Sequence, residues 1–204
     1  MKSKKVGTLF IVIGIIFIGI AITFYINNYI EDKKAGIASE QVMTKIIGKE
    51  KSHGDEITTE MTILNIDGND YIGYITIPKI NIQLPVMSDW NYDKLKIAPC
   101  RYNGWTETDN FVIAAHNYQR HFGKLSQLKQ GDSLTFTDMN GNVYMYEVGD
   151  IELLPPTATE EMIKSDWDLS LYTCVYSATK RVTVRCKKVG MYNYNRWITT
   201  EIQG

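Results

Sequence analysis

The chain opens with a short basic stretch followed by a long apolar run. Lys2, Lys4 and Lys5 precede an uncharged, mostly hydrophobic run from Val6 to Ile26. A helix of about twenty such residues, at 1.5 Å per residue, spans the roughly 30 Å hydrocarbon core of a bilayer. The length of the run, and the absence of a small-x-small cleavage pattern after Tyr25, favour a membrane anchor over a cleaved signal peptide. We therefore predict a cytoplasmic tail at residues 1–5 and a transmembrane signal anchor at residues 6–26.

The charges that flank the apolar run predict its orientation. The lysines before it are not matched by an excess of basic residues after it, because Glu31 and Asp32 stand before Lys33 and Lys34. The positive-inside rule then places the N-terminus in the cytoplasm. The predicted localisation is a single-pass protein of the plasma membrane, with everything after Asn27 on the outside.

Residues 27–69 are polar and contain few apolar runs. This pattern predicts an extracellular linker or N-terminal appendage, with a short amphipathic helix at residues 39–47. His53 falls in a breaker-rich part of this segment, where a solvated histidine is expected.

From Tyr71 the pattern changes to short runs of β-branched and aromatic residues separated by Pro, Gly, Asn and Asp. Such runs are typical of strands, and several of them in succession predict a closed or nearly closed, mainly β domain at residues 70–204. The MNGN sequence at residues 139–142 predicts a hairpin turn. Helices are expected only at residues 122–129 and 159–164, and a last strand near Trp197. The predicted strands are YIGYITI, INIQLPV, FVIAA, SLTFT, VYMYEV, DIELL, LSLYT and RVTVR.

Charge and cysteine content exclude several kinds of function. The formal net charge is -1, from 22 basic and 23 acidic residues, so the chain lacks the broad basic surface of a nucleic-acid-binding protein. Three cysteines, Cys100, Cys174 and Cys186, cannot all pair, and none has the CxxC spacing of a zinc or redox site. We expect at least one free thiol, no metal and no cofactor.

Two strand ends carry side chains capable of nucleophilic chemistry. Cys174 closes the run LSLYTC, and His116 ends the run FVIAAH. Each residue alone is more often structural than catalytic. A thiolate at neutral pH, however, needs a basic or cationic neighbour, and imidazole is the usual one. The pair is therefore a candidate catalytic site.

An arginine follows the cysteine closely in the sequence. Arg181 opens the strand RVTVR directly after the turn-like VYSATK, so a tight connection would bring its guanidinium near the sulfur. Such a group can bind a substrate backbone and stabilise an oxyanion. Arg185 faces the same side by strand alternation. A solvated arginine at a strand edge is the alternative for each.

Together these motifs resemble the sortase family. SLYTC at residues 170–174 is similar to the TLxTC signature, TKRVTV to the following strand with its arginine, and FVIAAH to the IAGH-type strand. FGKLSQLKQGDSLTF resembles the family's F-x-x-L-x-x-L-x-x-GD segment, and IGYITIPKINIQLPV its opening pair of strands. The likeness covers residues 71–189 in the family's order. Ala115 stands where Gly is common, and Cys100 where a small residue is common.

The resemblance implies an eight-stranded sortase-type β-barrel with short helices and a cysteine transpeptidase activity. Cys174 would attack the Thr-Gly bond of an LPxTG-like sorting signal, His116 would protonate the leaving amine, and Arg181 would stabilise the intermediate. Alignment by the KRVTV run assigns this last role to Arg181 rather than Arg185. Substrate-binding positions would be Thr173, Ala115 and Arg185.

The family also implies partners for the extracellular catalytic domain. These are surface proteins that bear a sorting signal and an amine acceptor, such as a peptidoglycan precursor or a pilin lysine. The short interval between His116 and Cys174 leaves no room for the inserted helix of class B sortases, so the resemblance is to class A or class D.

Three other functions remain as alternatives. A papain-like hydrolase would need its cysteine before its histidine and a largely helical domain, and this chain has the reverse order and little helix. A membrane-anchored, non-enzymatic surface binding domain would have Cys174 buried. A redox role would need Cys186 beside Cys174 on an adjacent strand.

Overall fold

A computed structural model describes residues 2–50, 59–108, 110–174 and 179–193 of the chain. The predictions made for His53 and for a strand near Trp197 fall outside these residues.

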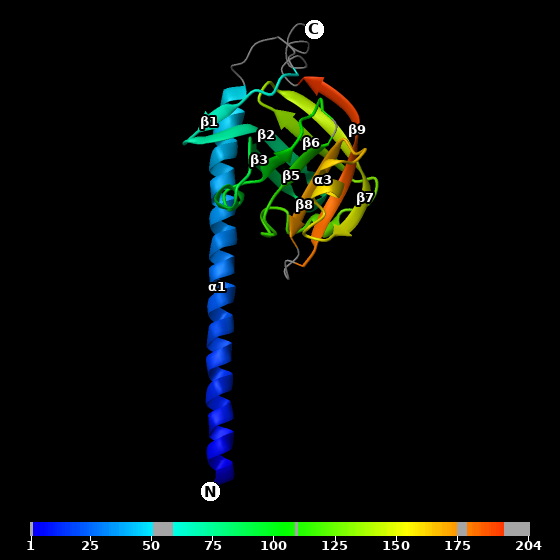
Figure 1. Ribbon diagram of the computed structural model, residues 1–204. Helices are drawn as coiled ribbons and strands as arrows, with labels where there is room; N and C mark the ends of the chain where they lie inside the picture. The colour runs from blue at the N-terminus through cyan, green and yellow to red at the C-terminus, as the bar shows by residue number, and fades with distance from the viewer. Residues whose placement is uncertain (1, 51–58, 109, 175–178, 194–204) are drawn as a thin grey trace.

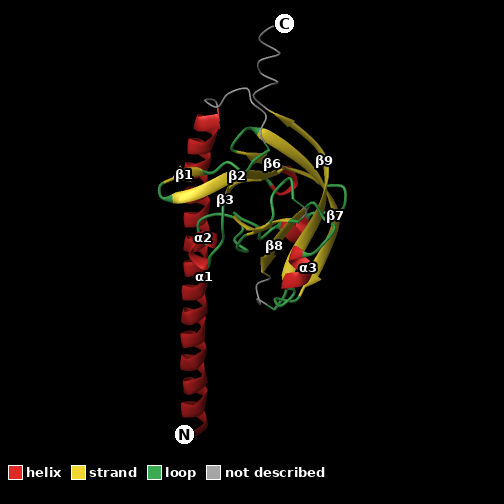
Figure 2. Cartoon of the chain, turned by 45° about the horizontal axis from the view of Figure 1, so that its top comes forward, coloured by secondary structure: helices red, strands yellow, loops and turns green. Residues whose placement is uncertain are grey.

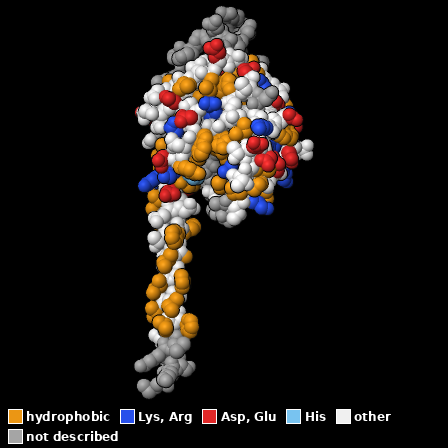
Figure 3. All heavy atoms as spheres, viewed as in Figure 1, with side chains coloured by type: hydrophobic (Ala, Val, Ile, Leu, Met, Phe, Trp, Pro, Cys, Tyr) orange, Lys and Arg blue, Asp and Glu red, His pale blue; other side chains and the backbone are white. Residues whose placement is uncertain are grey.

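One long helix dominates the N-terminal part of the molecule. Helix α1 (Lys2–Glu50) includes the whole predicted membrane span and continues without a break into the segment expected to be a linker. It projects far beyond the rest of the protein, and its apolar side chains from Leu9 to Phe24 are exposed along the projecting part (Figures 1 and 3). Among the described residues it is the one helix long and apolar enough to cross a membrane.

Beside the last turns of α1 lies a closed ring of eight strands. The ring order is β2-β3-β4-β5-β8-β9-β7-β6, and it closes because β6 also pairs with β2. A short ninth strand, β1, pairs with the start of β2 outside this ring. The strands are β1 (Leu64–Ile66), β2 (Asn69–Ile77), β3 (Ile82–Met87), β4 (Cys100–Asn103), β5 (Phe111–Ala114), β6 (Ser133–Asp138), β7 (Asn142–Leu154), β8 (Leu169–Cys174) and β9 (Arg181–Asn193). The predicted eight-stranded barrel is therefore confirmed (Figure 2).

The strands differ from the expected ones in two places. The runs VYMYEV and DIELL form one strand, β7, because an irregularity between Val148 and Asp150 lets pairing with β9 continue past Gly149. The eighth strand of the ring is β4, whose sequence CRYN has too little hydrophobic alternation to be recognised. The predicted hairpin turn is present between β6 and β7, where Gly141 has a φ of 79°.

The remaining helices are short, as expected. They are the 3-10 helices η1 (Pro78–Ile80) and η2 (Leu125–Gln127), and the α-helices α2 (Tyr92–Leu95) and α3 (Thr159–Ile163). Helix η2 lies inside the predicted helix at residues 122–129, and α3 agrees with the one at residues 159–164. Helices η1 and α2 were not predicted.

Two of the three apolar clusters among the described residues fill the barrel and join it to α1. The larger fills the barrel, and Phe111, Phe122, Phe136 and Ile113 in it have no exposed surface. The second joins Val42, Met43 and Ile46 of α1 to residues of the adjacent strands and loops. Helix α1 therefore packs against the barrel as a structural element: Ile66, Tyr71, Met87, Ala98, Cys100 and Met139 lie on the barrel side of this contact.

Candidate active site

Cys174 is the last residue of β8, and its side chain is exposed. The residues just before it are buried, and Thr173 is only 3% exposed. The strand therefore holds the thiol firmly while the sulfur itself faces solvent, as a nucleophile requires.

His116 follows the end of β5, the strand beside β8. The two strands are parallel, with Ala114 opposite Tyr172, and the amide of Ala115 donates a hydrogen bond to the Tyr172 carbonyl at 3.2 Å. Continued by two positions, this register places His116 beside Cys174. Neighbouring strands lie about 4.8 Å apart, so the imidazole and the sulfur belong to one site at one edge of the barrel.

Arg181 lies on the other side of Cys174. Strands β8 and β9 are antiparallel, and Cys174 is directly opposite Arg181. Opposite residues of such a pair project from the same face of the sheet. The guanidinium lies over the Tyr172 ring, 5.2 Å from its centroid. Its Nε is buried and has no hydrogen-bond partner within the part of the chain that the structure describes.

A hydrogen bond ties the two strand ends that carry the cysteine and the histidine. The Thr173 hydroxyl donates to the Ala115 carbonyl at 2.8 Å. The Ala115 side chain packs into the barrel core. In this structure both residues fix the spacing of His116 and Cys174, and their predicted contacts with substrate stay a prediction.

Arg185 shares a face with Arg181, as strand alternation predicts, but its surroundings are different. Its side chain is 3% exposed and lies 2.6 Å from Glu152 in an ion pair. It also donates to the Ser170 hydroxyl at 2.9 Å and to the Glu161 carbonyl, in α3, at 2.8 Å. The guanidinium is thus engaged beneath α3, and its predicted role in substrate binding stays a prediction.

The other two thiols are unsuited to either nucleophilic or redox chemistry. Cys100 and Cys186 are fully buried, and burial raises the pKa of both, to about 12 for Cys100. Cys186 pairs with Leu169 across β8 and β9, whereas Cys174 pairs with Arg181. The register separates the two cysteines by five positions along the strands, roughly 16 Å, so the redox interpretation is wrong.

The environment of His116 includes residues that the sequence patterns did not indicate. Its ring lies 4.9 Å from that of Tyr118, whose hydroxyl donates to the Glu31 carboxylate of α1 at 3.3 Å. Burial lowers the pKa of His116, the negative charge of Glu31 raises it and the positive charge of Lys96 lowers it. The place of Glu31 near the site was not predicted, because its segment looked like a linker and its contact with Tyr118 depends on the tertiary fold.

These groups have the chemistry that acyl transfer requires. The edge of the barrel presents an exposed thiol between an imidazole and a guanidinium, which is a nucleophile flanked by an acid-base group and an oxyanion donor. No group of three or more His, Cys, Asp or Glu side chains within the described ranges is arranged to hold a metal ion.

Comparisons with known proteins agree with this geometry. The chain matches the Sortase domain family over residues 75–189, more than half its length. Sortase A of Bacillus anthracis is 29% identical over 122 residues, which make up 57% of this chain and 58% of that protein. The match thus spans less than two thirds of that curated relative.

Solved structures show the same fold. Sortase C-3 from Streptococcus pneumoniae superposes with a TM-score of 0.58 and 24% identity, over 86% of this chain and 90% of that one. A sortase D5 transpeptidase from Clostridium perfringens has a TM-score of 0.57 and 22% identity, over 78% of this chain and 99% of that one. Sortases A and E are also among the similar structures, so the comparison does not narrow the class. The family match, the eight-strand ring and the grouping of thiol, imidazole and guanidinium lead to one conclusion: the chain belongs to the sortase family.

Proposed function

We propose that this protein cleaves an LPxTG-like sorting signal between Thr and Gly and transfers the acyl product to an amine. The observation that carries the proposal is the exposed thiol of Cys174 at a strand end between the strands of His116 and Arg181. Each neighbour matches a need of the reaction, one for proton transfer and one for charge stabilisation.

The first half-reaction forms a thioester. As Cys174 Sγ attacks the threonine carbonyl carbon, its proton passes to His116, which a lowered pKa keeps mainly neutral near pH 7. The tetrahedral intermediate collapses when its C–N bond breaks, and His116 gives the same proton to the departing glycine amine. The acyl group is then held on sulfur and the imidazole is neutral again.

The second half-reaction reverses these proton transfers. An incoming amine attacks the thioester carbonyl and loses a proton to His116, and the C–S bond breaks to restore the thiol. Arg181, directly opposite Cys174, stabilises the oxyanion in both halves with its guanidinium. Loss of one such donor typically costs about 10²- to 10³-fold in rate.

The expected partners follow from this activity and from α1. Donors are surface proteins with a sorting signal, and acceptors are amines of a peptidoglycan precursor or a pilin lysine. The apolar part of α1 anchors the protein in the plasma membrane with its N-terminus in the cytoplasm and the catalytic domain outside. We propose a class A-like or class D-like enzyme, which the single five-residue helix between β7 and β8 supports over class B.

The test is transpeptidation by the full chain in detergent. It is incubated with LPxTG-like peptides and an amine acceptor, and products are identified by mass spectrometry, including the acyl adduct on Cys174. Cys174→Ala should abolish both adduct and product, whereas Cys186→Ala, which removes a buried thiol on β9, should retain the adduct. Product formation that survives in Cys174→Ala would falsify the proposal.

A non-enzymatic binding domain is the competing function. It would leave Cys174 without reactivity toward any peptide, so a library of sorting-signal peptides that yields no acyl adduct at any sequence would favour it. The exposure of the Cys174 thiol argues against it.

A further inference from the structure

Helix α1 connects the membrane span to the barrel without a flexible joint. It contains no proline, the usual cause of a sharp kink, and is helical from Lys2 to Glu50. The apolar run ends at Ile26, and Tyr25 and Tyr29 are exposed at that level, where aromatic residues mark the bilayer interface. The orientation of the helix in a membrane therefore also sets the orientation of anything fixed to it.

The barrel is fixed to the next turns of this helix. Ala35, Ser39, Val42, Met43 and Ile46 are buried, at most 8% exposed, and their spacing of three and four residues places them on one face. Each buried Val, Met or Ile contributes about 1.5–3 kcal/mol. The contact is thus strong enough to hold the barrel in one orientation on the helix.

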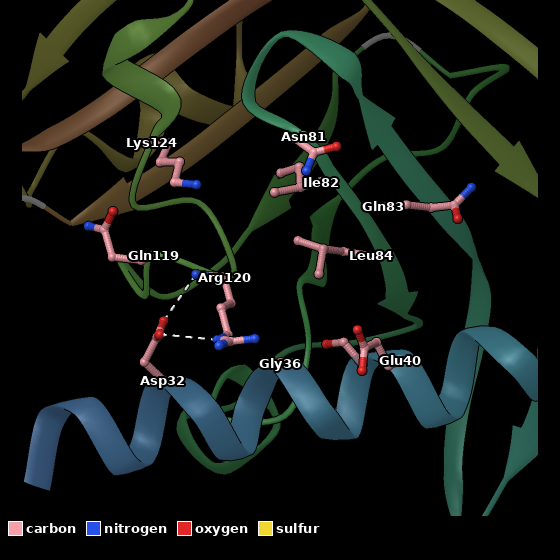
Figure 4. Close-up of a pocket in the computed structure, with 11 residues that line it drawn as sticks. Asp32, Gly36, Glu40, Asn81, Ile82, Gln83, Leu84, Gln119, Arg120 and Lys124 are labelled. Carbon is pink, nitrogen blue, oxygen red and sulfur yellow. Dashed lines mark hydrogen bonds and ion pairs between the residues drawn. The ribbon is translucent and has the colours of Figure 1, made fainter.

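Polar contacts extend this attachment toward the active site. Asp32 accepts a hydrogen bond from the Arg120 amide at 3.0 Å and lies 3.5 Å from the Arg120 Nε (Figure 4). Glu31 accepts a hydrogen bond from Tyr118, whose ring lies against that of His116. Asp32 and Arg120 also line a groove of about 530 Å³ between α1, β3 and the loop after β5. The loop that carries His116 is therefore bound to the first helical turns outside the span.

These contacts place the catalytic end of the barrel close to the bilayer. Glu31 lies five residues beyond Ile26, about 7 Å along the helix axis at 1.5 Å per residue. The headgroup layer of one leaflet is itself about 5–7 Å thick. Strand β8, which ends at Cys174, also points toward the side from which the membrane-spanning part of α1 projects (Figures 1 and 2).

We propose that α1 is a rigid ruler that holds the active site against the outer surface of the lipid bilayer. The enzyme then prefers membrane-anchored substrates whose cleavage site lies within a short tether of that surface. The substrate preference rests on the proposed transpeptidase function, whereas the height of the active site does not. A flexible linker, which the polar sequence of residues 27–50 would suggest, would instead let the barrel reach substrates at many heights.

The height can be measured without any turnover. Cys174 is the exposed thiol of the three, so a thiol-reactive donor dye labels it in the full chain reconstituted in liposomes. Energy transfer to a lipid labelled on its headgroup reports the distance to the surface. Seven residues (AEAAKAA) inserted between Ile30 and Glu31 add about two helical turns, keep the docking face in phase and should lift the dye by about 10 Å. The same insertion between Lys5 and Val6 is the matched control and should change nothing.

The substrate preference is measured on peptides anchored in the same liposomes. Their cleavage site is separated from the bilayer by spacers of increasing length. The insertion after Ile30 should lower turnover of the shortest-spacer substrate at least tenfold and shift the optimum by about three extended residues, the length that spans 10 Å. Turnover of a soluble peptide should stay within twofold of the unmodified chain.

The outcomes separate the two proposals. Equal energy transfer in both insertion variants, or a spacer optimum that does not move, would overturn the proposal that α1 sets the height of the active site. Failure of the unmodified chain to act on soluble and anchored peptides alike would sink the proposed function, and the energy-transfer measurement would still decide the height.

Discussion

The two arginines of β9 offer a direct test of how roles are divided along one strand. Arg181 and Arg185 point to the same face, but one lies beside the thiol and the other is enclosed under α3. Replacing each by Met keeps the length of the side chain and removes the charge. We expect Arg181→Met to impair catalysis and Arg185→Met to impair stability.

The magnitudes follow from the contacts of each side chain. Removing one partner of a buried ion pair costs about 3–5 kcal/mol, and the lower value applies to Arg185 because its partner Glu152 is 35% exposed and can be rehydrated. Each kcal/mol lost lowers the Tm of a domain of this size by about 2–4 °C, so the Tm of Arg185→Met should fall by about 6–12 °C. Arg181→Met loses a cation–π contact worth about 0.5–1 kcal/mol. Its Tm should therefore fall by at most a few degrees.

The assay pairs unfolding with turnover in the same detergent. Tryptophan fluorescence follows thermal unfolding of the barrel, because Trp105 belongs to its core. Turnover of an LPxTG-like peptide, measured well below Tm, should fall by about 10²- to 10³-fold in Arg181→Met and by less than tenfold in Arg185→Met. An Arg185→Met protein of unchanged Tm that has lost its activity would refute this reasoning and give Arg185 the role in substrate binding.

Three further predictions concern titratable groups. A methanethiosulfonate reagent should add one label to the native full chain, and peptide mapping should place it on Cys174, because the thiols of Cys100 and Cys186 are buried. A label on Cys100 or Cys186 would contradict the structure. Glu31→Gln should lower the pKa of His116, because the Glu31 carboxylate raises it. The acidic limb of the pH profile of kcat/KM should therefore move to lower pH, and a shift to higher pH would contradict the placement of Glu31. Burial lowers the pKa of His121 to about 4, so the unfolded chain binds a proton that the folded chain does not as pH falls through 6.5. Chemical denaturation should therefore show about 3 kcal/mol of stability lost between pH 6.5 and pH 4, and His121→Gln should remove most of that dependence, whereas an unchanged slope would assign it to other groups.

Most of the fold could be predicted because its strands are short, alternating and hydrophobic. The barrel, its hairpin turn and the brevity of its helices were all expected from these patterns. The strand β4 was not, because Arg101 and Asn103 interrupt any apolar period and the strand forms only through pairing with β3 and β5. The break predicted at Gly149 was also wrong, since a strand irregularity absorbs that residue.

The reach of α1 was underestimated for a related reason. Residues 27–50 are polar on most positions, and the buried face from Ala35 to Ile46 includes the polar Ser39 and the small Ala35. Such a stripe is weak evidence of a packed helix until the barrel surface opposite it is known. Sequence patterns therefore indicated the three candidate catalytic residues, but Glu31 and Tyr118 emerged only from the fold.

The topology explains how residues far apart in the chain form one site. Because β5 and β8 are parallel neighbours, their carboxyl ends meet at the same edge, and His116 and Cys174 lie there, each two residues beyond the last pair of the two strands. The antiparallel β9 returns to that edge and places Arg181 opposite Cys174. Helix α1 is bound to the loop after β5, so the same edge is also the part of the barrel that lies nearest the membrane span. Contacts on the two sides of His116, through Ala115 to Thr173 and through Tyr118 to Glu31, thus connect the site both to the barrel and to α1, the helix that in our proposal sets its height above the bilayer.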